Sequence, residues 1–206
     1  MPVAEVLYPV NLDLSGKRCV VVGGGSVASR KVAGLVASGA NVTVIAPEIS
    51  DAIKALPVDV QQRPYHEGDL AGAWLAITAV DNPEVGRRVW AEGQAARVWV
   101  NAADDPAGCS FTLPAVYRQG PVTVAVSTAG HSPALAAWIR ERVAGELGPE
   151  VGLLAQLLSE ARDSLKAAGR STEDVDWRRA LDSDMLELIR NGHLDQARER
   201  LQACLS

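Results

Sequence analysis

The sequence predicts an α/β fold: a Rossmann-like parallel sheet domain, a small region that follows it and a helical C-terminal domain. Three observations support this prediction. A run of apolar, mostly β-branched residues, 19–22, leads into three glycines and then into helix-spaced apolar residues, which indicates strand, tight turn and helix. A second apolar strand, 41–46, completes a β-α-β unit within about thirty residues. From residue 149 onward the apolar spacing is helical.

The bulk composition is that of a globular protein. Of 206 residues, 48% are hydrophobic and 22% charged, enough for one core with an appendage or for two modest domains. No stretch approaches the ~20 apolar residues of a membrane span, and no signal-peptide pattern opens the chain. We therefore expect a cytoplasmic protein without a membrane partner. The net charge of −5 argues against a nucleic-acid partner, and three scattered cysteines argue against a disulfide framework or a structural metal.

The glycine-rich turn predicts a dinucleotide site. Gly23, Gly25 and Ala28 form the pattern G-x-G-x-x-A, in which a small residue replaces the last glycine of the dinucleotide-binding fingerprint. Gly23 can adopt the backbone angles of the turn, Gly25 lets the main chain approach a pyrophosphate, and Ala28 lets helix and strand pack closely. The N–H groups at the start of the helix then face the phosphates.

Two expectations concern the flanks of the turn. Residues 7–17, before it, are expected to form an edge piece and a turn, and the helix after it is expected to end near Gly39, a natural C-cap.

The acid beyond the second strand bears on which dinucleotide is bound. NAD-binding chains often place an acid about twenty residues beyond the turn to hold the adenosine ribose. Glu48 stands there, after Pro47, and no Arg or Lys lies within residues 41–53. This favours NAD over NADP. The alternative is that Glu48 merely caps a helix.

Three further strands and a helix complete the predicted sheet. The strands are expected over residues 58–65, 73–80 and 97–100, and the helix opens with Asn82 as N-cap and Pro83 at its first position. Ligands of open α/β sheets lie beyond the carboxyl ends of the strands. In a doubly wound sheet, four polar residues would share the rim of the glycine turn: Thr78, Asp81, Asn101 and Asp104.

After residue 110 the alternation of predicted strands and helices gives way to two strands followed by helices. Strands are expected over 111–116 and 122–128, followed by a helix with Ser132 as N-cap. The helical tail from Pro149 repeats apolar residues at spacings of three and four. Because so small a tail has little core of its own, we expect it to pack on another element, such as a second subunit.

The residues permit only a few chemistries. H-E-x-x-H, G-x-S-x-G and P-loop spacings are absent from the sequence. The carboxylate pair Asp104-Asp105 lies on a strand-end loop, where an aspartate could take the proton that accompanies hydride transfer to a nicotinamide. The alternative is that Asp-Asp-Pro forms a turn. His131, at a Gly-His-Ser-Pro helix entrance, either contacts an anionic ligand or is an exposed loop residue.

Four ordered motifs resemble those of one enzyme family. GGGSVASRK, NVTVIAPE, NAADDPAGCSF and AVSTAGHSPALAAWIRERV follow one another as in the precorrin-2 dehydrogenase family, the N-terminal module of sirohaem synthase. The likeness covers residues 5–145 well and the tail loosely. It implies oxidation of precorrin-2 to sirohydrochlorin with NAD, in some members with iron insertion, and an intertwined homodimer. The implied domains are a NAD-binding Rossmann domain (1–113), a dimerisation region (114–147) and a helical C-terminal domain (148–206).

The resemblance also implies roles for single residues. The family's essential aspartate falls on Asp104. The chain departs from many relatives at Ala137, where they have Arg, and from some at Thr128, where they have the serine that is open to phosphorylation. The candidate cofactor contacts are Gly23, Gly25, Ser26, Val27, Pro47, Glu48, Thr78 and Asp81; the candidate substrate contacts are Asn101, Thr128, His131 and Ser132, with Arg118, Arg140 and Arg142 as possible neighbours of the substrate carboxylates.

Three hypotheses follow for the function. The first is NAD-dependent precorrin-2 dehydrogenation, in which Asp104 manages the proton. The second adds ferrochelation in the same pocket, shared by Asp104 and His131, and an assay with sirohydrochlorin and ferrous or cobalt ions would separate the two. The third is a non-catalytic NAD-sensing or oligomerisation module, which has no need for Asp104 beside the loop 129–133.

Overall fold

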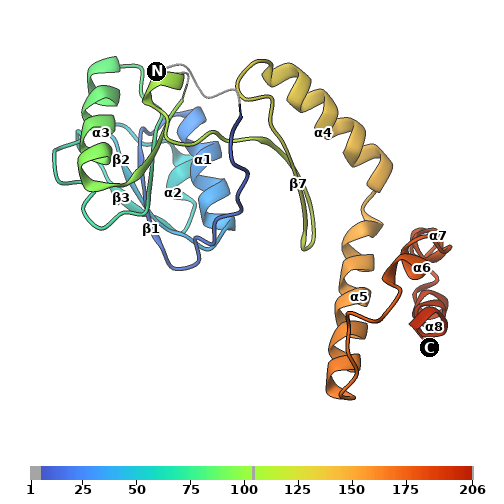
Figure 1. Ribbon diagram of the computed structural model, residues 1–206. Helices are drawn as coiled ribbons and strands as arrows, with labels where there is room; N and C mark the ends of the chain where they lie inside the picture. Colours follow the sequence, from blue (N-terminus) through green and yellow to red (C-terminus); the bar gives the residue numbers. More distant parts are fainter. Residues whose placement is uncertain (1–5, 104, 206) are drawn as a thin grey trace. The chain divides into compact units, whose positions relative to one another are not determined.

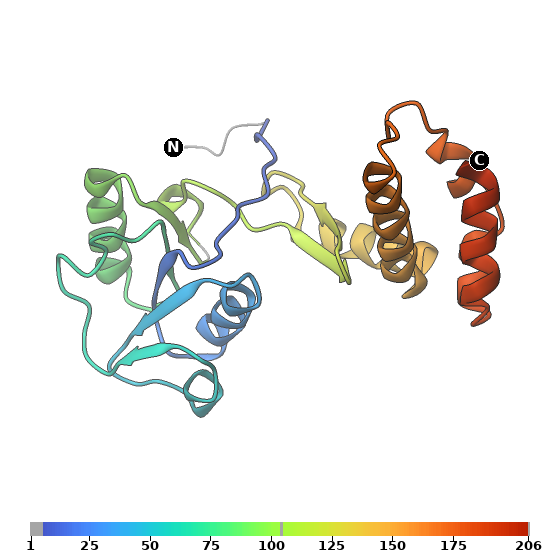
Figure 2. The same ribbon diagram turned by 90° about the horizontal axis from the view of Figure 1, so that it is seen from below.

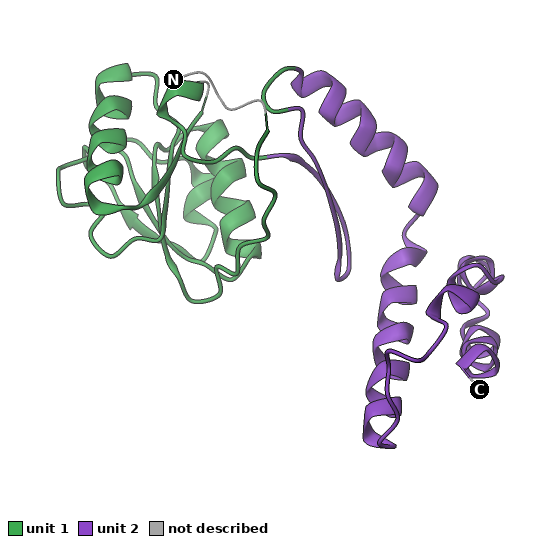
Figure 3. Ribbon diagram, in the orientation of Figure 1, with its two compact units in different colours: residues 1–113, 129–131 green, residues 114–128, 132–206 purple. Residues whose placement is uncertain are grey.

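The computed structural model describes residues 6–103 and 105–205. They form two compact units: unit 1 contains residues 1–113 and 129–131, and unit 2 contains residues 114–128 and 132–206 (Figure 3). Within the described ranges, no helix is both long and apolar enough to cross a membrane.

Unit 1 is built on a five-stranded parallel sheet (Figure 1). From β1 the chain moves outward through β2 to β3, and it then returns to the other side of β1 with β4. This change of direction makes the gap between β1 and β4 a topological switch point, the usual ligand position in such sheets. The strands, in spatial order, are β3 (Asp59–Gln61), β2 (Asn41–Ile45), β1 (Arg18–Val22), β4 (Leu75–Thr78) and β5 (Trp99–Ala102).

Helices cover both faces of this sheet, so it is doubly wound, and the predicted Rossmann-like fold is confirmed (Figures 1 and 2). Alternate side chains of β1 point into separate cores. Cys19 and Val21 pack with the buried side of α1, whereas Val20 and Val22 pack with Val89 of α3. The helices of unit 1 are α1 (Ser26–Ala37) and α2 (Asp51–Lys54) on one face and α3 (Pro83–Ala96) on the other; a short 3-10 turn, η1 (Pro106–Gly108), follows β5.

The last strand of the sheet begins and ends later than predicted. β5 covers Trp99–Ala102, not residues 97–100. Arg97 ends α3 in the left-handed region with φ of 56°, and the Val98 N–H donates to the carbonyl of Gly93 at 2.9 Å. Because the helix cap uses these two residues, Asn101 lies inside the strand rather than beyond it.

Unit 2 begins with an antiparallel hairpin, on which α4 packs. The strand predicted over 111–116 starts only at Ala115, because the preceding segment is bound to β5: the Ser110 N–H donates to the Val100 carbonyl at 2.8 Å. The elements of unit 2 are β6 (Ala115–Gln119), β7 (Val122–Val126), α4 (Pro133–Leu147), α5 (Glu150–Ala167), α6 (Trp177–Leu181), α7 (Met185–Arg190) and α8 (Leu194–Leu205).

The helical tail has a core of its own, contrary to the prediction that it would lack one. Leu154 and Leu157 of α5 pack with Met185, Ile189 and Leu201, all of them buried. The side chains that close this core come from three later, short helices, whose sequence spacing alone does not show that they fold back onto α5. The tail therefore needs no second subunit to bury its apolar residues.

An ion pair between buried Glu150 and exposed Arg190 also links α5 to α7 in the tail. Glu150, at the first turn of α5, is buried, and its Oε1 accepts a hydrogen bond from Nε of Arg190 in α7 at 2.5 Å. Its own backbone N–H at the helix start and the Arg190 guanidinium hold the pKa of Glu150 below its usual value.

Candidate functional site

The glycine turn joins β1 to α1 at the carboxyl edge of the sheet, next to β4. Gly23 has a φ of +133°, and a Cβ added there would lie 2.2 Å from the carbonyl oxygen of Ala79. A Cβ on Gly24 would lie 1.9 Å from the carbonyl oxygen of Glu48. Neither position has room for a side chain. The turn is thus packed tightly against the loops that follow both neighbouring strands.

Gly25 differs from the two glycines before it. It is exposed, and no heavy atom of the described residues lies within 4 Å of an added Cβ. It is also the N-cap of α1, and its carbonyl accepts the first helical bond, from the Ser29 N–H at 2.9 Å. The amides of Ser26, Val27 and Ala28 precede that bond and have no acceptor within the helix. The opening over Gly25 therefore faces a helix N-terminus that suits a phosphate.

The loop after β2 is fixed against this turn. The Ser50 N–H donates to the Gly24 carbonyl at 3.0 Å, and the Glu48 carbonyl packs on Gly24. Both Pro47 and Glu48 are exposed. A solvent-facing carboxylate is thereby held beside the turn, where a dinucleotide presents its adenosine ribose.

Thr78 and Asp81 continue the rim on the other side of the turn. Val22 is in register with Thr78, and Thr78 with Ala102, so the ends of β1, β4 and β5 lie side by side. Thr78 is buried at its strand end, whereas Asp81 is exposed in the loop that leads to α3. These two positions are compatible with the predicted cofactor contacts, which stay predictions.

Asn101 has a structural task in the loop after β5. It is buried, and its Nδ2 donates to the carbonyl of Phe111 at 2.9 Å and contacts Sγ of Cys109 at 3.5 Å. The side chain thus holds the returning segment against the strand. Its predicted contact with substrate is not tested by these bonds and stays a prediction.

Asp104, the predicted catalytic residue, lies outside the described residues. The neighbouring Asp105 caps η1, accepting a hydrogen bond from the Ala107 N–H at 3.1 Å on its Oδ1, so the turn interpretation applies to Asp105. On the far side of η1, the Cys109 sulfur accepts a hydrogen bond from the Ala102 N–H at 3.2 Å. Burial raises the pKa of the Cys109 thiol, which keeps it protonated at neutral pH.

The loop of residues 128–132, which contains three predicted substrate contacts, is held by the hydroxyl groups of Thr128 and Ser132. Thr128 Oγ1 donates to the Ser132 carbonyl at 3.0 Å and accepts from the Ser132 N–H at 3.1 Å. Ser132 Oγ in turn accepts from the Leu135 N–H at 3.1 Å and caps α4, as predicted. Ala129 and Gly130 between them have φ of 49° and 83°, and His131 is exposed. The substrate contacts predicted for Thr128, His131 and Ser132 stay predictions.

The structure thus gathers the predicted cofactor contacts of unit 1 along one rim, while Thr128 and Ser132 belong to unit 2. Sequence reasoning missed two residues at this rim. Gly24 could have been found, because a third consecutive glycine exceeds what the fingerprint requires. Cys109 could not have been found from the sequence, because its sulfur bonds mainly to backbone groups, which no sequence motif marks.

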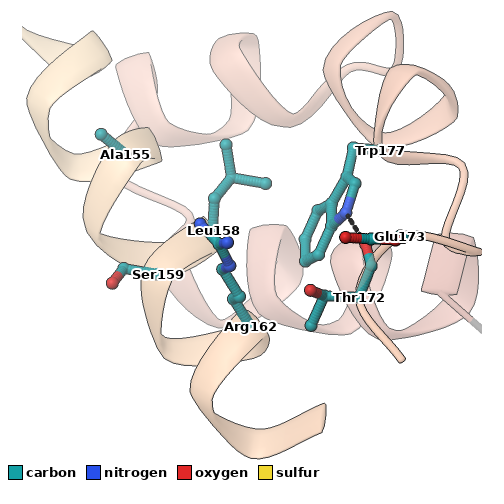
Figure 4. A pocket seen from close by; sticks show the side chains of 7 residues that line it. All are labelled: Ala155, Leu158, Ser159, Arg162, Thr172, Glu173 and Trp177. Carbon is teal, nitrogen blue, oxygen red and sulfur yellow. Dashed lines mark hydrogen bonds between the residues drawn. The ribbon is translucent and has the colours of Figure 1, made fainter. Parts of the chain in front are cut away.

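A cavity of about 550 Å³ lies elsewhere, within unit 2 (Figure 4). Side chains of α5 face Trp177 across it, and the indole Nε1 donates to the carbonyl of Thr172 at 2.9 Å. None of the predicted site residues lines this cavity. Its lining is Ala155, Leu158, Ser159, Arg162, Thr172, Glu173 and Trp177. Among the residues that the structure describes, no three His, Cys, Asp or Glu side chains are grouped so as to hold a metal ion.

Two family models match segments of this chain. Residues 10–115 match the family described as "Putative NAD(P)-binding", and residues 119–146 match "Sirohaem biosynthesis protein central". The chain is 34% identical to the siroheme synthase of Nitrosococcus oceani over 96% of its own length, and 33% identical to that of Methylobacillus flagellatus, also over 96%. It spans only 43% and 44% of the lengths of these curated relatives.

A solved structure gives a match over nearly the whole of both chains. The structure titled "SirC, precorrin-2 dehydrogenase" superimposes with a TM-score of 0.73 and 27% sequence identity. The match covers 96% of this chain and 98% of that one. The likeness includes the helical tail, which the sequence motifs covered only loosely.

Proposed function

The chain belongs to the precorrin-2 dehydrogenase family, the family of the sirohaem synthase N-terminal module, and from this premise we propose that it oxidises precorrin-2 to sirohydrochlorin with NAD. The observation that carries the proposal is the opening over Gly25. It combines a backbone approach without side chains and a helix N-terminus, the two features that a pyrophosphate requires.

The choice of NAD over NADP rests on Glu48. Its carboxylate is exposed beside the glycine turn, because its own backbone is packed on Gly24. A carboxylate at this place accepts hydrogen bonds from ribose hydroxyls and repels a 2′-phosphate. Within residues 41–53 no Arg or Lys offers a counter-charge to such a phosphate.

The reaction removes two hydrogens from precorrin-2, one as hydride and one as a proton. The nicotinamide, when bound, supplies the acceptor for the hydride. The protein must place the substrate against it and supply a base for the proton. We assign the proton to the carboxylate of Asp104, the second residue after β5 in the sequence.

We also propose that the chain works as a homodimer through residues 114–147. Among the described residues of this segment only Ala136 is buried. Trp138 and Leu135 on α4 are 57% and 47% exposed. An apolar helix and hairpin with so little buried surface suits an interface with a second copy, and that copy could bring Arg118, Arg140 or Arg142 towards the substrate carboxylates.

Incubation of the purified protein with precorrin-2 and NAD tests the proposal, with absorbance of NADH and sirohydrochlorin as the readout. The wild type is expected to form both in equal amounts. The variant D104N should bind NAD with unchanged Kd and form neither, because an amide cannot take the proton. The variant D105N is the matched control and should keep its activity, since Asp105 caps η1. A D104N variant with near wild-type turnover would remove Asp104 from the mechanism.

A further inference from the structure

The cavity of unit 2 has the size and the walls of a small-molecule site. Its volume of about 550 Å³ falls within the range of roughly 300–1,000 Å³ that such sites usually occupy. One wall is α5, and the other is the segment 172–177, which leads into α6 (Figure 4). Both walls belong to unit 2, so the cavity is built by one unit alone.

The ring of Trp177 is held in place on the second wall. Its Nε1–H donates to the carbonyl of Thr172 at 2.9 Å, which fixes one edge of the indole. Across the cavity the ring stands opposite Leu158 and Arg162, which lie one helical turn apart on α5 (Figure 4). Because the ring is already ordered, it offers a flat apolar surface that loses little freedom when a ligand binds.

Opposite charges lie on the two walls of the cavity. Arg162 belongs to α5 and Glu173 to the segment before α6, and both side chains are exposed. Among the residues that the structure describes, neither Arg162 nor Glu173 takes part in an ion pair. A guanidinium and a carboxylate that line one cavity without pairing leave room between them for a molecule that contacts both.

We infer that this cavity binds a flat aromatic molecule with an acid group at one end and an amino group at the other. The ring stacks on Trp177, the acid group pairs with the Arg162 guanidinium, and the amino group donates to the Glu173 carboxylate. A ligand without the amino group leaves Glu173 without a donor, and a ligand without the acid group leaves Arg162 without an anion. The site goes beyond the proposed function, because none of the residues predicted to bind cofactor or substrate lines the cavity.

Three aromatic probes test the class of ligand on the full chain. They are 4-aminobenzoate, which carries both groups, benzoate, which lacks the amino group, and aniline, which lacks the acid group. The readout is the indole N–H signal of Trp177 in ¹⁵N-labelled protein, after sequential assignment among the five tryptophans. We expect 4-aminobenzoate to shift this signal saturably with a millimolar Kd, and the other two probes to bind about threefold or more weakly.

Two charge variants and a matched control test the assigned contacts. R162Q and E173Q change exposed side chains, so both should keep the wild-type Tm. R162Q should raise the Kd of 4-aminobenzoate about fivefold and leave that of aniline unchanged, whereas E173Q should raise it about fivefold and leave or improve that of benzoate. Arg179 is exposed on α6 and does not line the cavity, so R179Q should bind all three probes as the wild type does.

Several results would overturn the inference. Without a saturable shift of the Trp177 signal by 4-aminobenzoate, the cavity would be a packing gap only. Equal Kd values for the three probes would mean that the ring alone is bound, and an equal loss in R162Q and R179Q would mean that net charge sets the affinity. Failure of the chain to oxidise precorrin-2 would contradict the proposed function but leave this test unaffected.

Discussion

Substitution of Gly25 by alanine should separate cofactor binding from folding. The added methyl group meets no atom of the described residues within 4 Å, and the φ of −85° at this position is ordinary for alanine. Alanine lowers the entropy of the unfolded chain, which stabilises by about 0.4–1 kcal/mol, but it is a poorer N-cap than glycine by a similar amount. The free energy of unfolding should therefore stay within about 1 kcal/mol of wild type.

In the proposed cofactor site, the same methyl group lies where the pyrophosphate would approach the amides of Ser26 and Val27. A hydrogen bond to a charged group contributes about 1.5–3 kcal/mol, and each 1.4 kcal/mol is a factor of about ten in affinity. Loss of one such bond should raise the Kd of NAD by about 10- to 100-fold. Calorimetric titration with NAD gives the Kd, and thermal unfolding without NAD gives the stability.

Two further glycines supply the controls. Gly34 lies on the same helix with nothing within 4 Å of an added Cβ, so G34A should stabilise by roughly 0.5–1 kcal/mol and leave the Kd unchanged. G24A should lose both folding and binding, because its Cβ would sit 1.9 Å from the Glu48 carbonyl oxygen. A folded G25A variant with wild-type affinity for NAD would refute the placement of the pyrophosphate over this turn.

Three other predictions follow from single contacts. E48R should weaken NAD binding by about tenfold and improve NADP binding, as measured by titration with both cofactors; equal effects on the two would contradict the ribose assignment. The guanidinium of Arg63 holds the pKa of Asp69 below its ordinary value, so this carboxylate stabilises the fold fully above about pH 4 and the stabilisation is lost as the pH falls through the lowered pKa. D69N should therefore lower Tm at pH 7 and flatten its decline below pH ~4, and parallel curves for the two proteins would exclude this pair as a cause. W138E should shift a dimer to monomer in light scattering at micromolar concentration, whereas an unchanged mass would move the interface away from α4.

The part of the fold that depends on local chemistry could be predicted from the sequence. β1, the glycine turn and α1 were predictable because apolar alternation, backbone freedom and helix spacing act within a few neighbouring residues, and Asn82 and Ser132 cap their helices as expected. The start of β5 could not be predicted, because the left-handed cap at Arg97 depends on how α3 ends. The core of the tail could not be predicted either, since the contact of Met185 with α5 joins segments that are distant in the sequence.

The residues of the candidate site also fall into those that could be predicted from the sequence and those that could not. Gly23 and Gly25 could be chosen because the conformational freedom of glycine is a property of the residue itself. Glu48 needed only a count along the chain. The contacts of Cys109 could not be predicted, because its sulfur bonds to backbone groups of Ala102 and Asp105, which come near it only after the chain has folded.

The contact between Gly24 and residue 48 has a consequence for how this site can diversify. Only main-chain atoms take part: the carbonyl of residue 48 packs on Gly24, and the amide of Ser50 bonds to the Gly24 carbonyl. The side chain at position 48 is therefore free to be exchanged while the loop keeps its conformation. With the proposed cofactor contacts, a single substitution at this exposed position would change the cofactor preference, because the backbone of the glycine turn does not depend on the side chain of residue 48.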